Sequence, residues 1–279
     1  MASHIYTATH AIVLDTFREA FARKIFWGLF GLSTAMVLFF LFIMKIDIVE
    51  GAAATISMFG LQSGKEVDAA RLVKQVQAGV ATFLYTWGMF LAVFASAGLI
   101  PSVLEPGRIE LLLSKPISRT HLLLGRFLGN LMVVSFNIVY LVAGVWLILA
   151  FKTNIWRPEF LISIVSTIFL FSILLSVVTL IGVTLESTAL AVMIPAALMV
   201  ISPILAQHKI MMRLLGSEWS RRMWRGLYEV LPKVYDLGKM TLDFVSDRGV
   251  ESFTPVYSSA AFGAGVLALA VYIFQRRNF

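Results

Sequence analysis

Long uncharged apolar runs alternate with short charged segments along the chain. A hydrocarbon core about 30 Å thick is crossed by about 20 helical residues, and unpaired backbone groups are too costly in lipid. The lengths of the runs favour helices over the roughly ten-residue alternating strands of an outer-membrane barrel. The pattern therefore predicts an all-α integral membrane protein whose single membrane domain, residues 1–279, has six transmembrane helices. The predicted spans are residues 25–44, 78–104, 127–151, 160–185, 187–208 and 252–275.

The fourth and fifth runs are separated only by Glu186. They are either two spans joined by a tight turn or one span followed by a re-entrant segment. The length of the stretch 160–208 favours two spans. Because Pro195 and Pro203 both lie in the fifth run, we expect a kinked or broken helix there.

An amphipathic pattern precedes the first span, within residues 1–24. Leu14, Phe17 and Phe21 recur at helical spacing, and charged residues occupy the other face. This pattern predicts a helix that lies at the membrane interface and leads into the first span. The alternative is a polar lead-in without a function of its own. The first apolar run is too long for the core of a cleavable signal peptide.

Composition agrees with a membrane protein, because only 14% of the residues are charged and 59% are hydrophobic. A soluble domain carries about 25% charged residues. In so apolar a chain, the net charge of +7 indicates membrane orientation and the lipid bilayer as a partner, with no nucleic acid. The sequence has no cysteine and four scattered histidines, so we expect no metal and no cofactor in this chain.

Orientation follows from the basic residues near the two ends of the chain. The pair Arg276–Arg277 and the basic first helix favour both termini on the cytoplasmic side of an inner or plasma membrane. Residues 209–251 would then form outer interfacial helices, capping a pathway or meeting a partner. A cytoplasmic placement of this segment stays open, because it contains a cluster of basic residues.

The segment between the second and third spans, residues 105–126, has the most specific pattern. Pro106 and Gly107 end the second span, and Pro116 disfavours a helical conformation at Lys115. Ser118 is placed to cap the next helix. The pattern predicts a compact, charged elbow against the membrane surface, suited to docking another protein.

This elbow resembles the cytoplasmic coupling elbow of ABC-2 type permeases, whose fold is shared with ABCG-like exporters. Arg108 stands where that family usually has Ser or Thr, and Arg126 replaces the usual Lys. The six spans and the large segment before the last one extend the resemblance, which is closest to the branch containing the permease of the nitrous-oxide-reductase maturation system. The matching residues are Glu105, Gly107, Glu110, Leu113, Ser114, Pro116, Ile117, Ser118, Arg119 and Gly125.

The resemblance implies the permease subunit of an ATP-driven transporter, more an exporter than an importer. It would pair with a second permease copy or paralogue and with separate ABC ATP-binding subunits that hold ATP and Mg²⁺. The alternative is a non-transporting membrane anchor or scaffold for an ATPase or assembly complex. The residues implied to couple the ATPase to the spans are Glu105, Gly107, Arg108, Glu110, Leu113, Ser114, Pro116, Ser118 and Arg119.

The rest of the sequence argues against chemistry within this chain. Residues 60–66 approach a phosphate-binding loop but are one residue short and have Glu66 where a hydroxyl would bind Mg²⁺, so we expect ATP hydrolysis in a partner. The predicted spans hold no charge, which disfavours ion coupling and suits an amphiphilic substrate. The polar and proline residues that could line a path or pack helices together are Tyr85, Trp87, Asn130, Asn137, Tyr140, Pro195 and Pro203.

Overall fold

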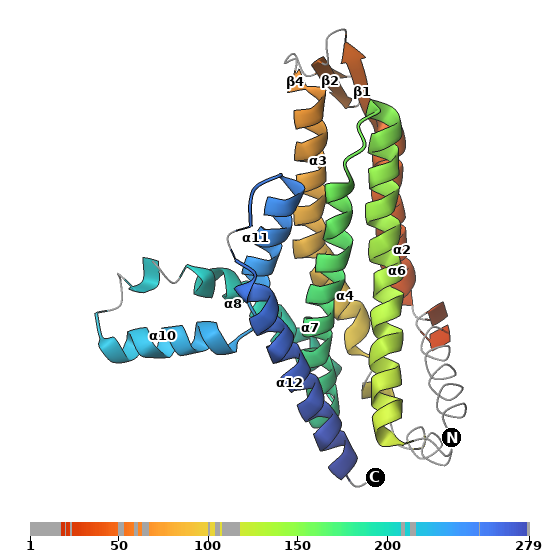
Figure 1. Cartoon of the computed structure of the whole chain (residues 1–279). Coiled ribbons are helices and arrows are strands. Elements are labelled where there is room, and N and C mark those ends of the chain that lie inside the picture. The colour runs from red at the N-terminus through yellow and green to blue at the C-terminus, as the bar shows by residue number, and fades with distance from the viewer. Residues whose placement is uncertain are drawn as a thin grey trace.

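The computed structural model forms a bundle of long helices with a small sheet at one end, seen at the top of Figure 1. A helix of 13 residues, α10, projects sideways from the bundle. The end of α12 and the start of α6 lie at the opposite end from the sheet. The structure describes residues 18–19, 21–22, 24–49, 53–58, 61–62, 67–99, 101–103, 107, 118–207, 210–212, 216–250 and 252–277.

The first apolar run forms a helix that leads into the sheet. Helix α2 spans Lys24–Leu38, continues through a π-helical turn at Phe39–Ile43 and enters strand β1 at Met44. The four strands are antiparallel, with β2 central and Met44 opposite Met58. Their bounds are Met44–Val49 (β1), Ala53–Met58 (β2), Leu61–Gln62 (β3) and Val67–Asp68 (β4).

The remaining helices complete the bundle. A π-helical turn at Leu84–Gly88 joins α3 to α4, so that the second span is one continuous helix, and a 3₁₀ turn at Pro158–Leu161 leads into α7. The bounds are Ala69–Phe83 (α3), Met89–Ala97 (α4), Arg119–Thr153 (α6), Ile162–Leu185 (α7), Thr188–Ala206 (α8), Glu218–Val230 (α10), Val234–Val245 (α11) and Thr254–Arg276 (α12).

The predicted class, an all-helical membrane protein, is confirmed, and the small sheet is an addition to it. Five helices are long and apolar enough to cross a membrane, and a shorter apolar helix covers Phe26–Phe42. The sheet follows a local pattern, since Lys45 and Asp47 alternate with isoleucines as they do in a strand. The five long helices are Ala69–Ala97, Arg119–Thr153, Pro158–Leu185, Thr188–Ala206 and Thr254–Arg276.

The fourth and fifth runs are separate helices joined by a tight turn. Glu186 ends α7 in the left-handed conformation, with φ of 49°, and the Ser187 hydroxyl accepts a hydrogen bond from the Leu190 backbone N–H at 3.4 Å. Of the kink or break expected in the second of these helices, the break is wrong. Helix α8 runs unbroken through Pro195 and Pro203.

Helix α7 lies at the centre of the bundle, in contact with α4, α6, α8, α11 and α12. It has no charged residue between its ends and is apolar on every side, which is the pattern of a helix that other helices largely surround. Phe171, Leu174 and Val178 are accordingly buried. Near its start, however, Val165 is 71% exposed. The other spans are exposed on one side, where lipid would cover them.

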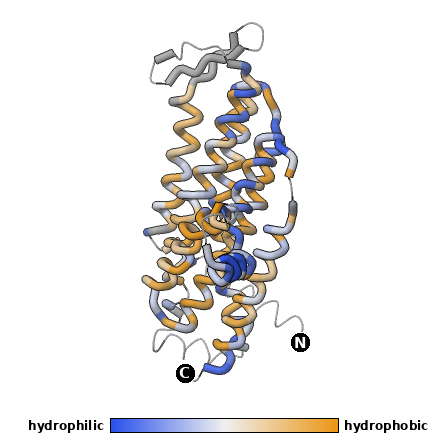
Figure 2. The backbone as a smooth tube through the Cα atoms, turned by 90° about the vertical axis from the view of Figure 1, so that its left-hand side faces the viewer, coloured by the Kyte–Doolittle hydropathy of each residue, from blue (hydrophilic) through white to orange (hydrophobic). Residues whose placement is uncertain are grey.

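The segment before the last span divides into two different helices. Helix α10 has no buried residue and lies across the direction of the spans, as expected of an interfacial helix (Figure 1). Figure 2 looks along this helix and shows it as hydrophilic beside the hydrophobic spans. Helix α11 differs from the prediction, because it packs against α3, α7 and α8 and buries Val234, Leu237 and Thr241.

The distance along the bundle from the Glu186 turn to α10 is close to the thickness of a membrane, so α10 lies at the level expected for a membrane boundary. The 19 residues of α8 run from the Glu186 turn to the segment that leads into α10. At about 1.5 Å per residue they span about 28 Å, close to the thickness of a hydrocarbon core. Helix α6 has 35 residues and therefore extends beyond that boundary.

Candidate functional site

An apolar groove with a volume of about 550 Å³ lies between the second span, α8 and α11. Such a groove, apolar with a few polar groups, is typical of a site for an apolar or amphiphilic molecule. Its walls come from three segments that are far apart in the sequence. The lining residues are Thr82, Tyr85, Thr86, Trp87, Phe90, Ala196, Met199, Val200, Pro203, Val234, Tyr235, Gly238, Lys239 and Leu242.

The π-helical turn in the second span supplies three of the polar side chains of this groove. Such turns insert an extra residue into a helix and are frequent at functional sites. Tyr85, Thr86 and Trp87 belong to the turn and line the groove, and Trp87 is 61% exposed. The Tyr85 hydroxyl donates a hydrogen bond to the Val234 carbonyl, so the turn is tied to the start of α11.

A glycine on α11 permits this contact. A Cβ atom at Gly238 would overlap three atoms of the Tyr85 ring. The ring therefore lies against the bare backbone of α11, and the groove has its shape because residue 238 has no side chain.

Pro203 shapes the opposite wall. It has no N–H group and cannot donate to the carbonyl of Met199, which stands four residues earlier and also lines the groove. The Met199 carbonyl therefore lacks the helical hydrogen bond that residue 203 would otherwise donate. Pro203 of α8 and the π-helical turn of the second span thus line the groove from two different spans.

The other polar residues predicted in the spans pack helices together. The Asn130 carbonyl oxygen accepts a hydrogen bond from the Ser96 hydroxyl at 3.0 Å, joining α6 to α4. Tyr140 stacks on Phe30 of α2 with ring centroids 5.0 Å apart. Pro195 is buried within α8. Of the seven predicted residues, the structure thus brings Tyr85, Trp87 and Pro203 to the groove.

Asn137 lies apart from both groups. It is 2% exposed and borders an internal cavity of about 30 Å³ between α2, α4 and α6. Among the described residues, its side-chain amide has no hydrogen-bond partner. The cavity is large enough for a water molecule, and a buried amide of this kind is normally satisfied by water when protein groups do not reach it.

Part of the predicted elbow is described. Ser118 caps α6 as predicted, because its hydroxyl accepts the His121 backbone N–H at 3.3 Å, and Gly107 has φ of 81°. The helix starts at Arg119, so residues 119–126 belong to α6 and not to the elbow. The other predicted coupling residues, Glu105, Arg108, Glu110, Leu113, Ser114 and Pro116, lie outside the described residues.

Arg119 binds the C-terminal end of the last span. Its guanidinium donates to the carbonyls of Gln275, at 3.3 Å, and of Arg277. The Gln275 amide donates to the Thr120 hydroxyl at 2.6 Å, and Arg277 pairs with Glu186 in the turn between α7 and α8. The start of α6, directly after the elbow, is therefore joined to the end of α12, which in turn pairs with the turn between α7 and α8.

A buried ion pair next to the elbow is the main feature that the sequence analysis missed. Arg126 is 2% exposed and donates to the Glu19 carboxylate at 2.7 Å, and the Ser102 hydroxyl donates to the same carboxylate at 3.1 Å. Glu19 belongs to the predicted interfacial helix, of which residues 18, 19, 21 and 22 are described and helical. The pair ties that helix to α6. It had no local signal, because the partners are 107 residues apart.

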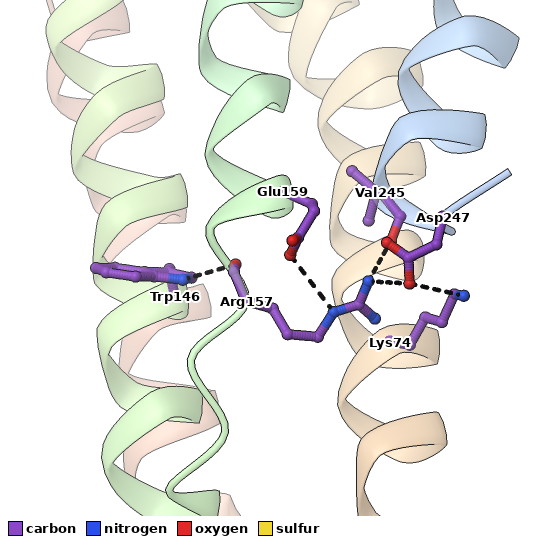
Figure 3. A network of polar contacts seen from close by, with 6 residues as sticks. All are labelled: Lys74, Trp146, Arg157, Glu159, Val245 and Asp247. Carbon is purple, nitrogen blue, oxygen red and sulfur yellow. Dashed lines mark hydrogen bonds and ion pairs between the residues drawn. The ribbon is translucent and has the colours of Figure 1, made fainter. Parts of the chain in front are cut away.

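A second ionic network lies at the opposite end of the bundle (Figure 3). Asp247 accepts hydrogen bonds from Lys74 at 3.0 Å and from Arg157 at 2.5 Å, and Arg157 also donates to the Val245 carbonyl at 3.3 Å. Trp146 donates to the Arg157 carbonyl at 2.8 Å. The network thus joins α3, the α6–α7 connection and the end of α11.

The charges of this network also fix the protonation of Asp247. The hydrogen bond from Lys74 lowers the pKa of Asp247 below its ordinary value, partial burial opposes this change, and the Arg157 charge adds to it. The carboxylate is therefore ionised at neutral pH. It attracts both cations and holds the end of α11 against α3 and the α6–α7 connection.

The described residues offer no centre for catalysis at a metal. Within them, no group of three or more His, Asp or Glu side chains stands close enough together to hold a metal ion. The groove presents hydroxyls, an indole, the Lys239 ammonium at its edge and apolar groups, which can bind and guide a molecule.

Comparison with known proteins places the chain in a family. None of the curated proteins matches it. The family model described as ABC-2 family transporter protein matches residues 10–279, which is almost the whole chain. The long apolar helices agree with that match. The chain belongs to the ABC-2 transporter family and is a multi-pass membrane component of an ABC transporter.

Proposed function

We propose that this chain is the permease subunit of an ATP-driven exporter and that the groove between the second span, α8 and α11 forms part of the translocation path. The observation that carries the proposal is the placing of Tyr85 and Trp87 in an apolar groove walled by separate spans. Movement of these spans relative to one another would open or close the groove. An apolar wall suits an amphiphilic cargo.

The contacts around the elbow support coupling to a separate ATPase. A force applied at the elbow reaches α6 through Ser118 and Arg119, and Arg119 passes it to the end of α12. The Glu19–Arg126 pair carries it to the N-terminal helix. A docked subunit that binds ATP and Mg²⁺ could therefore move several spans at once.

The working complex that we propose contains a second permease copy or paralogue and separate ABC ATP-binding subunits, in an inner or plasma membrane with both termini cytoplasmic. Within the family, the elbow sequence favours the branch of the nitrous-oxide-reductase maturation permease. Because the chain has no cysteine, single cysteines report the orientation. An impermeant thiol reagent added outside should label a Ser217→Cys variant and leave Ser114→Cys unlabelled, whereas the reverse result contradicts the topology.

Co-purification tests the partnership. The tagged full chain, extracted from its native membrane in mild detergent, should carry with it an ABC ATP-binding subunit with ATPase activity. Glu110→Ala or Arg119→Ala should lower the recovery of that subunit or the ATPase rate. If the complex contains no ATP-binding subunit, the proposal is wrong.

Thiol modification tests the path. Val200 lines the groove and is 67% exposed, whereas Val165 on α7 is 71% exposed and lies outside the groove. N-ethylmaleimide should lower substrate-stimulated ATP turnover of the Val200→Cys complex and leave the Val165→Cys complex at the level of treated wild type. Equal turnover in both variants, with labelling verified by mass, would point to a membrane anchor for an ATPase and not to a path through this groove.

A further inference from the structure

Helix α11 separates the apolar groove from a second, polar cavity of about 580 Å³. The polar cavity lies between α11, the end of α8 and the start of α12, and it includes Gln207 and Thr254. Lys239 borders both cavities. The two spaces therefore meet along one helix, with a single cation at their common edge.

The polar cavity contains equal numbers of cations and anions: Lys233 and Lys239, and Asp236 and Asp243. Lys233 lies over the Tyr228 ring at 4.6 Å, and the Tyr228 hydroxyl donates to Asp236 at 2.8 Å. Within the part of the chain that the structure describes, the side chains of Lys239 and Asp243 make no hydrogen bond or ion pair. These two charges are available to a ligand.

The spacing along α11 places Asp236 beside these two charges. Asp236 and Asp243 stand three residues before and four residues after Lys239, so all three lie on neighbouring positions of one helical face. A purely anionic ligand would meet two carboxylates there, and a purely cationic one would meet two lysines. A compact group that carries both a phosphate and an ammonium complements the whole set.

The heights of the two cavities match one leaflet of a bilayer. The polar cavity is lined by the end of α8 and the start of α12. These helix ends lie at the level from which α10 projects (Figure 1), where lipid headgroups would lie. The groove reaches along α8 to Ala196, ten residues before Ala206. Ten helical residues span about 15 Å, half of a hydrocarbon core about 30 Å thick.

We propose that the groove and the polar cavity together bind one zwitterionic phospholipid with a primary ammonium group, of the phosphatidylethanolamine type. A hydrocarbon chain lies along Trp87 and Val200, the phosphate pairs with Lys239, and the ammonium donates hydrogen bonds to Asp236 and Asp243. A primary ammonium is favoured over choline because it can donate to carboxylates. Among the described residues, Tyr228 is the one aromatic side chain that lines the cavity, which is too few for an aromatic cage. This assignment rests on the proposed function, since it names the class of molecule that the groove accepts.

Quenching of tryptophan fluorescence by brominated acyl chains tests the assignment. The purified full chain is titrated with lipids that share the same brominated chains and differ only in headgroup: phosphatidylethanolamine, phosphatidylcholine, phosphatidylglycerol and diacylglycerol. Subtracting the quenching of a Trp87→Phe variant isolates the signal from the groove. Half-maximal quenching should need about tenfold less phosphatidylethanolamine than either phosphatidylglycerol or diacylglycerol, the factor given by one charge-assisted hydrogen bond.

Two variants assign the headgroup contacts. Lys239→Gln should remove most of the preference for phosphatidylethanolamine over diacylglycerol, and Asp243→Asn should reduce its preference over phosphatidylglycerol. Lys24→Gln and Glu229→Gln change exposed charges outside the two cavities and should leave both preferences unchanged. Continued quenching by diacylglycerol shows that each variant is folded with an intact groove.

The two ways of failing are distinguishable. Equal quenching of Trp87 by all four headgroups overturns the lipid assignment and leaves the groove as a path for other amphiphiles. A preference that Lys239→Gln and Asp243→Asn do not change overturns the assignment of the headgroup to α11. If none of the four lipids quenches the fluorescence of wild type more than that of the Trp87→Phe variant, the groove does not admit a hydrocarbon chain. The proposed path is then contradicted as well.

Discussion

The substitution Gly238→Ala tests the contact between the second span and α11 with the smallest possible change. One methyl group would overlap the Tyr85 ring, which must move and thereby lose the hydrogen bond from its hydroxyl to the Val234 carbonyl. The glycine lies inside a helix, where alanine is otherwise the better residue. The local and the tertiary effects of the substitution therefore have opposite signs.

Three contributions set the change in the free energy of unfolding that Gly238→Ala should cause. Overpacking costs about 1–3 kcal/mol, and a buried hydroxyl without a partner costs about 1–3 kcal/mol. The gain in helix propensity is about 1 kcal/mol. We therefore expect Gly238→Ala to lower the free energy of unfolding by about 1–5 kcal/mol.

The assay is reversible unfolding of the purified chain in mixed micelles by titration with a denaturing detergent, followed by circular dichroism. Gly226→Ala on α10 is the matched control, because nothing lies within 4 Å of an added Cβ there, and it should be neutral or stabilising. The double variant Tyr85→Ala/Gly238→Ala should recover the part of the loss that comes from overlap. If Gly238→Ala is as stable as wild type, the close approach of the ring to α11 is refuted.

Three further predictions concern the ionic contacts. Lys152 donates to three carbonyls at the end of the first span, at 2.7–2.8 Å, so Lys152→Met should lower the free energy of unfolding by about 1.5–3 kcal/mol in the same assay. Glu19→Ala leaves the buried Arg126 without its carboxylate and should lower the free energy of unfolding by about 3–5 kcal/mol. The double variant Glu19→Leu/Arg126→Met should be close to wild type in stability. Equal losses of stability in the two variants would contradict a buried pair. Because the pKa of Asp247 is lowered in the folded chain, its contribution is complete above the ordinary aspartate pKa and is lost as the pH falls below about 4. Thermal midpoints of wild type should therefore fall more steeply in that range than those of Asp247→Asn, and parallel curves would show that Lys74 and Asp247 are not coupled.

The sequence by itself determined the features that depend on neighbouring residues. A helix in lipid must satisfy its backbone within its own segment, so the apolar runs marked the spans without any knowledge of their packing. Two features of neighbouring residues were also predicted: Ser118 caps α6, and the turn at Glu186 separates α7 from α8. The π-helical turns and the small sheet were not predicted, because their local patterns are weak or short.

The tertiary structure alone decided which polar groups meet and which helices are covered. Glu19 and Arg126 are 107 residues apart, and Tyr85 and Val234 are 149 apart, so no local pattern connects them. Helix α11 has an amphipathic pattern, which does not distinguish a helix that faces lipid from one that packs against other spans, since both surroundings are apolar. Only the packing of α11 against α3, α7 and α8 shows that it closes one side of the groove. That placement depends on Gly238, where the absence of a side chain carries no signal until the Tyr85 ring lies against it.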